Sequence, residues 1–278
     1  MARWRLSVFF ALVALLASPA LGQLRGHGGP VRALAVSQDG TRLASGGFDT
    51  TAIVWSLASG NAQQVLRFHE GAVNAVVLLP DGRIATSGED ARIAIWQPNG
   101  GKPAVVLEGH TAPVVALAVS PGGKMLASAS WDNTVRLWPL AGGPARVLEG
   151  HQQNVNGVAF TPDGQSVVSA GYDLTLRIWP VSDAGSPRIV TLPTPLNTVA
   201  VAGNGDIFTA GASGKVHVLS SEGMPQVELE AAPVPIIALA LSTDGRLVAA
   251  SSIRGAVAII DRSNAKLLRT LVGPGLPA

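Results

Sequence analysis

The sequence predicts an all-β protein built from one repeated unit of four short antiparallel strands. Hydrophobic residues make up 47% of the 278 residues and charged residues 14%, so the chain can bury a large core and is not disordered. The chain also has 32 glycines and 19 prolines without the three-residue period of collagen, which indicates many tight turns. The third observation is a turn signal that returns at a nearly constant interval along the chain.

Six pairs of turn-forming residues mark this repeat: Asp39-Gly40, Asp81-Gly82, Gly122-Gly123, Asp163-Gly164, Asn204-Gly205 and Asp244-Gly245. Each pair adopts positive φ at low cost and lies between apolar runs, so each predicts a β-hairpin. In the fourth unit, strands are expected over 155–160, 166–170, 174–179 and 188–192, which leaves no room for a helix. One four-stranded sheet cannot bury both faces, whereas sheets stacked around an axis can. We therefore predict a β-propeller with six visible repeats.

The first four units each carry a histidine, a hydroxyl residue, an aspartate and a tryptophan at matching places. These sets are His27, Ser45, Asp49 and Trp55; His69, Thr86, Asp90 and Trp96; His110, Ser128, Asp132 and Trp138; and His151, Ser169, Asp173 and Trp179. The pattern resembles the WD-repeat (Trp-Asp repeat) β-propellers, in particular exported bacterial members, over about residues 24–273. The resemblance implies a hydrogen-bond network within each blade. Such a network is structural, because a buried imidazole and carboxylate need polar partners.

All six units depart from this pattern, and the last two depart most. The aspartate of the signature Trp-Asp pair is absent, because Ser56, Gln97, Pro139 and Pro180 follow the tryptophans. Ser213 and Leu219 in the fifth unit, and Arg254 and Ile260 in the sixth, stand where aspartate and tryptophan are expected, and Leu192 and Ala232 replace the histidine. We therefore expect blades 5 and 6 to be held by packing alone and to be the least stable part of the protein.

The propeller domain is predicted over residues 23–278, with repeats that begin near residues 26, 68, 109, 150, 191 and 231. Residues 267–271 align with the outer-strand segment 146–148, so the sixth blade is expected to carry its own outer strand. Residues 272–274 then align with 149–151, where the next repeat opens. Two alternatives follow: the ring closes at six blades, or a seventh is missing.

Residues 1–22 have the layout of a signal peptide. Arg3 and Arg5 precede an apolar run, and the segment closes on Ala20-Leu21-Gly22, with small residues at the two positions that a signal peptidase requires. The run is about 12 residues long, whereas a membrane span takes about 20. We predict cleavage before Gln23 and a periplasmic or extracellular location; an uncleaved anchor or a buried N-terminal helix is the alternative.

Composition argues against several classes of partner and chemistry. Without Arg3 and Arg5 the chain has 18 basic and 18 acidic residues, so we expect no nucleic-acid partner and no membrane contact after cleavage. The absence of cysteine excludes disulfides, thiol nucleophiles and covalent haem attachment within these 278 residues. A Ser-His-Asp trio that recurs in four units indicates structure rather than catalysis. We expect no catalytic residue, no metal site and no cofactor.

One set of positions predicts binding. In the family that the chain resembles, the residue before each turn aspartate and an early residue of each first strand point from the top face. These partner-binding candidates are Phe48, Glu89, Trp131, Tyr172, Arg32, Asn74, Asn156 and Asn197. Three of them are aromatic in a chain with only 5% aromatic residues, and aromatic rings and arginine are typical interface anchors. Alternatively, the rings pack only on neighbouring loops.

These observations favour a non-catalytic scaffold, expected to be a monomer, that binds a protein or peptide partner outside the cytoplasm. An accessory or N-terminal module of a periplasmic c-type cytochrome system is the alternative, because the resemblance extends to exported propellers fused to such domains. A propeller hydrolase or lactonase is less favoured, since no cluster of carboxylates or histidines can be placed at a channel mouth.

Overall fold

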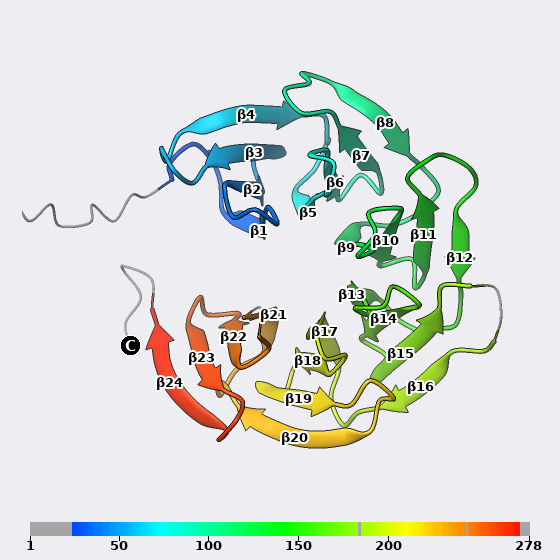
Figure 1. Cartoon of the computed structure of the whole chain (residues 1–278), viewed down its shortest axis with the longest axis vertical. Coiled ribbons are helices and arrows are strands. Elements are labelled where there is room, and N and C mark those ends of the chain that lie inside the picture. Colours follow the sequence, from blue (N-terminus) through cyan, green and yellow to red (C-terminus); the bar gives the residue numbers. More distant parts are fainter. Residues whose placement is uncertain (1–23, 183–184, 243, 273–278) are drawn as a thin grey trace, which may run out of the picture.

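The computed structural model describes residues 24–182, 185–242 and 244–272, and these contain 24 β-strands and no helix. The strands form six four-stranded antiparallel sheets around one axis, which confirms the predicted all-β propeller (Figure 1). The predicted signal peptide, residues 1–22, lies outside the described residues.

Each sheet is one blade made of four consecutive strands. Blade 1 contains β1 (Val31–Val36), β2 (Arg42–Gly47), β3 (Thr51–Ser56) and β4 (Ala62–Arg67), and blade 2 contains β5 (Val73–Leu78), β6 (Ile84–Gly88), β7 (Ile93–Trp96) and β8 (Pro103–Leu107). Blade 3 contains β9 (Val114–Val119), β10 (Met125–Ser130), β11 (Val135–Pro139) and β12 (Arg146–Leu148), and blade 4 contains β13 (Val155–Phe160), β14 (Ser166–Gly171), β15 (Thr175–Pro180) and β16 (Arg188–Thr191). Blade 5 contains β17 (Leu196–Val201), β18 (Ile207–Gly211), β19 (Lys215–Leu219) and β20 (Pro225–Glu230), and blade 6 contains β21 (Ile236–Leu241), β22 (Leu247–Ser252), β23 (Val257–Asp261) and β24 (Lys266–Leu271).

The repeated turn pairs connect the first and second strands of each blade. Their glycines, at positions 40, 82, 123, 164, 205 and 245, all have φ between 65° and 89°, a conformation that favours glycine. The first strand of every blade lies nearest the axis and the fourth lies at the periphery (Figure 1). Blade 6 carries its own outer strand, because β24 pairs with β23 as expected from the alignment of residues 267–271.

Neighbouring blades pack face to face through apolar side chains. Between blades 3 and 4, for example, Ala127 and Leu137 pack in one cluster with Val158, Phe160 and Trp179. Five such clusters join the six blades in chain order. Burial between blades therefore supplies the core that no single blade can form.

Blades 1 and 6 each pack on one neighbouring blade only. The innermost strand β1 contacts β5 and β21 contacts β17, but β1 and β21 make no comparable contact with each other (Figure 1). Leu34 on β1 is consequently 65% exposed, whereas Leu117 at the same place in blade 3 is 9% exposed. The face of blade 1 that points away from blade 2 therefore exposes apolar side chains whose counterparts in the other blades are more buried.

The expectation that blades 5 and 6 are held by packing alone is wrong. The guanidinium of Arg262, just after β23, donates to the buried carboxylate of Asp206, just before β18, and to the side chain of Gln226 at 3.1 Å. The same guanidinium lies 5.2 Å above the ring of Phe208. An ion pair and a cation–π contact thus tie blade 6 to blade 5.

Candidate functional site

The histidine, hydroxyl residue, aspartate and tryptophan of each of blades 1–4 meet in one hydrogen-bonded chain. The histidine Nδ1 lies 2.7–3.0 Å from the aspartate carboxylate. The histidine Nε2 lies 2.7–2.8 Å from the serine or threonine hydroxyl, to which the indole N–H donates at 2.8–3.0 Å. A carboxylate only accepts, so Nδ1 donates to it, and Nε2 accepts the proton of the hydroxyl.

These chains lie in the interior of the blades. In blade 4, Ser169 is completely buried and His151 is 5% exposed. The Ser169 oxygen accepts the indole N–H of Trp179 inside the blade. Because this oxygen is completely buried, a substrate cannot reach it. The repeated Ser-His-Asp trio therefore connects strands and turns within one blade through buried hydrogen bonds. This is the geometry of a structural element.

Burial and hydrogen bonding act in opposite directions on the ionisable members. Burial alone would raise the pKa of Asp132, but hydrogen bonds from His110 and Thr134 outweigh it and hold this pKa well below its usual range. For His151, burial is the largest influence and lowers the pKa, although Asp173 opposes it. A lowered pKa keeps the imidazole of His151 neutral at pH 7, as its accepted hydrogen bond requires.

A second arrangement lies at one mouth of the central channel. In every blade the second residue of the first strand stands at a β-bulge, where the register with the second strand shifts. These six bulge residues are Arg32, Asn74, Val115, Asn156, Asn197 and Ile237, and all six line one cavity. Because a bulge redirects a side chain, the shared position explains why residues far apart in sequence converge.

The cavity at this channel mouth has a volume of about 480 Å³, and two aromatic side chains line it. Phe48 is 50% exposed and Trp131 is 40% exposed, although both follow buried second strands. The guanidinium of Arg32 lies 5.5 Å over the Phe48 ring. Trp131 donates its indole N–H to Asn156 Oδ1 at 3.0 Å, so both rings have fixed orientations.

The asparagines have different surroundings. Asn156 Nδ2 donates to the carbonyl of Leu196 at 3.0 Å, and Asn197 Nδ2 donates to the carbonyl of Ile236 at 2.9 Å, so both amides join one blade to the next. Asn74 is 5% exposed, yet neither of its side-chain polar atoms has a hydrogen-bond partner. An unpartnered buried amide is costly, which makes Asn74 the most unusual polar group of this mouth.

The structure brings six of the eight partner-binding candidates together at this cavity. Glu89 and Tyr172 are exposed but do not line it. Tyr172 lines a separate cavity of about 420 Å³ with residues including Leu174 and Pro195. Sequence reasoning missed Val115 and Ile237, although both stand at the same repeat position as Arg32 and would have been found by extending that position to all six units.

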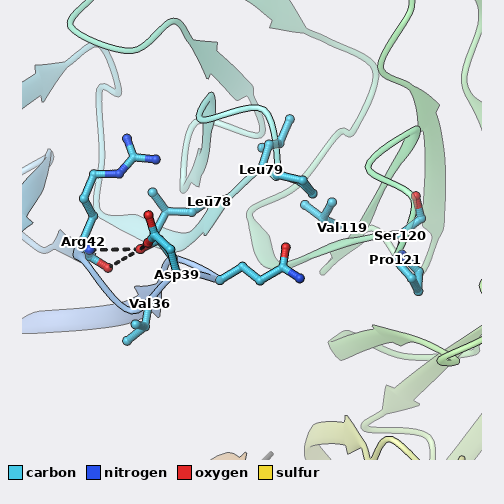
Figure 2. A pocket seen from close by; sticks show the side chains of 11 residues that line it. Val36, Asp39, Arg42, Leu78, Leu79, Val119, Ser120 and Pro121 are labelled. Atoms are coloured by element: carbon cyan, nitrogen blue, oxygen red, sulfur yellow. Dashed lines mark hydrogen bonds between the residues drawn. The ribbon is translucent and has the colours of Figure 1, made fainter.

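The opposite mouth holds a cavity of about 600 Å³ between the hairpin turns of blades 1 to 3 (Figure 2). Its polar side is the first turn, where the Ser37 hydroxyl accepts the N–H of Arg42 at 2.9 Å and donates to the Asp39 carboxylate at 2.5 Å. Hydrogen bonds from Ser37 and Thr41 lower the pKa of Asp39 to about 2. These polar groups already satisfy one another within the turn.

The described part of the chain contains neither a metal-binding cluster nor a membrane-spanning helix. Within residues 24–182, 185–242 and 244–272, no three histidine, aspartate or glutamate side chains are grouped so that they could hold a metal ion. No helix in the same residues is long and apolar enough to cross a membrane.

Comparison with protein families agrees with the architecture. Residues 19–56, 60–97, 101–139 and 142–180 match the WD40 family described as "WD domain, G-beta repeat". The four matches together span more than half of the chain and coincide with the blades that carry the histidine-to-tryptophan chains. The chain therefore belongs to the WD40 repeat family of β-propellers, whose members generally serve as protein-interaction scaffolds.

Proposed function

We propose that this protein is a non-catalytic scaffold that binds a protein or peptide partner at the channel mouth lined by Arg32, Phe48 and Trp131. The single observation that carries this proposal is the pair of exposed, oriented aromatic rings on either side of a cavity of about 480 Å³. Rings of this kind contribute large contact area at low entropic cost when a partner covers them.

We also propose that the protein is exported and acts in the periplasm or outside the cell. This proposal rests on residues 1–22, with their two arginines, their short apolar run and their small residues near position 22. Sequencing of the N-terminus of the protein recovered from the exported fraction tests it. The expected first residue is Gln23, and recovery of an intact Met1 from the cytoplasm would contradict the proposal.

The binding proposal is tested by capture from the exported fraction of the native cells on immobilised protein. Phe48→Ala removes a ring that lines the cavity, and Tyr172→Ala is the matched control because it removes an exposed ring outside the cavity. We expect wild type and Tyr172→Ala to retain the same proteins and Phe48→Ala to lose them, with unchanged thermal midpoints. Equal capture by all three folded proteins would refute the proposed site.

A further inference from the structure

The channel mouth carries one formal charge. Arg32 is the only ionisable residue that lines the cavity, and it is exposed. No carboxylate of the described residues forms an ion pair with it. The carboxylate of Asp49, the residue that follows Phe48, is occupied by His27 and by the N–H of Gly28. The guanidinium is therefore available to an anion from outside the molecule.

A buried asparagine without hydrogen-bond partners also lines the cavity. Asn74 lines this cavity and a second one of about 260 Å³, as do Arg32 and Asn197. Its amide can donate and accept at once, and the described protein atoms satisfy neither atom.

The apolar part of the mouth is organised before any ligand arrives. Asn156 orients the Trp131 ring through the indole N–H, and Arg32 covers the ring of Phe48. Because these side chains are already ordered, little further entropy is lost when a ligand packs on them. Val31, Val115, Ile237 and Ala238 complete the apolar lining.

We propose that the mouth recognises an acidic peptide segment, in which an aspartate or glutamate carboxylate pairs with the Arg32 guanidinium and an adjacent apolar or aromatic side chain packs on Phe48 and Trp131. This inference rests on the proposed function and specifies the chemistry of its partner. The planar guanidinium fits a carboxylate through two parallel N–H donors.

A carboxylate fits the mouth better than a phosphorylated side chain does. A phosphate ester brings a charge of about −1.5 to −2 and three strong acceptor oxygens. The lining offers a single guanidinium, and Asn156 and Asn197 already donate to backbone carbonyls. One bidentate arginine therefore balances the charge of one carboxylate and leaves a phosphate partly uncompensated.

The experiment uses a bead-displayed library of random heptapeptides with acetylated and amidated ends, sorted with the fluorescently labelled mature protein. The ends are blocked so that every carboxylate comes from a side chain. Four variants are sorted in parallel: Arg32→Gln, the charge reversal Arg32→Glu, Phe48→Ala and Arg42→Glu. Arg42 lies at the opposite mouth, so Arg42→Glu matches the change in net charge without changing the site.

We expect wild type and Arg42→Glu to select peptides with aspartate or glutamate beside an apolar residue. Arg32→Gln should bind the selected peptides about 10-fold to 100-fold more weakly, because a hydrogen bond to a charged group is lost. Arg32→Glu should shift the selection toward lysine and arginine. Unchanged thermal midpoints verify that the variants remain folded.

The remaining outcomes separate the two proposals. Peptides that depend on Phe48 but show no acidic preference would overturn this inference and leave the proposed binding site intact. A preference for phosphorylated over carboxylate peptides, measured by adding phosphoserine versions of the selected sequences, would also overturn it. If no selected peptide responds to Phe48→Ala, the acidic-peptide inference and the site itself both fail.

Discussion

The substitution Asp132→Ala tests the structural role of the recurring hydrogen-bonded chains. The carboxylate of Asp132 accepts from His110 Nδ1 and from the Thr134 hydroxyl, each at 2.7 Å. It also accepts the backbone N–H groups of Thr134 at 3.0 Å and of Thr111 at 3.2 Å. Alanine removes all four acceptor contacts at the turn between β10 and β11.

The size of the stability loss depends on which hydrogen-bond donors water can reach once the carboxylate is removed. The His110 side chain is only 1% exposed, so its buried Nδ1–H keeps only the long contact to the Thr134 hydroxyl at 3.4 Å, at a cost of about 1 to 3 kcal/mol. The Thr134 contacts add roughly 1 kcal/mol, because this residue can be partly rehydrated. We therefore expect the free energy of unfolding to fall by about 2 to 4 kcal/mol.

Urea unfolding of the protein, followed by tryptophan fluorescence, measures this loss. Ser213→Ala is the control, because Ser213 stands at the equivalent place in blade 5 and makes a single side-chain contact to the N–H of Lys215 at 3.3 Å. The control should change the free energy of unfolding by less than about 0.5 kcal/mol.

The effect of Asp132→Ala should also depend on pH. The pKa of Asp132 is lower in the folded protein than in the unfolded chain, so its stabilisation is present above about pH 4 and is lost as the pH falls further. The gap between wild type and variant should narrow accordingly below pH 4. A variant with wild-type stability at pH 7, or a gap that widens in acid, would refute the structural role of Asp132.

Three further measurements probe other parts of the structure. Leu117→Ala should lower the free energy of unfolding by about 2 to 4 kcal/mol and Leu34→Ala by less than about 1, because only the first leucine is buried; equal losses would mean that another surface covers β1. His217 has a buried Nε2 without a partner, and burial lowers its pKa. Its contribution to stability should therefore decline as the pH falls below about 6.5. The thermal midpoint of His217→Leu should vary less between pH 7 and 5 than that of wild type, and an unchanged pH profile would contradict this. Arg262→Ala leaves the buried carboxylate of Asp206 without its cation. Hydrogen exchange should become faster in blades 5 and 6 while blades 2 and 3 keep their protection. A uniform change in all blades would contradict a local role of this ion pair.

The sequence by itself determined the class of fold and the repeat. Turns such as the one at Asp163-Gly164 can be predicted from the local sequence, because positive φ depends on one residue and its neighbours. The histidine-to-tryptophan sets were equally visible, since each lies within one blade and returns at the same interval in four of them. Repetition in the sequence therefore indicates which side chains share a blade.

Contacts between blades were decided only by the tertiary structure. Arg262 and Asp206 are 56 residues apart and belong to no repeated pattern, so nothing in the sequence paired them. The gathering of Arg32, Asn74 and Trp131 around one cavity depends on how far each blade is rotated about the axis, as does the separation of Tyr172 from that cavity. The physical reason is that a 41-residue pattern specifies each blade through local hydrogen bonds and burial, whereas the positions of side chains between blades depend on how whole sheets pack.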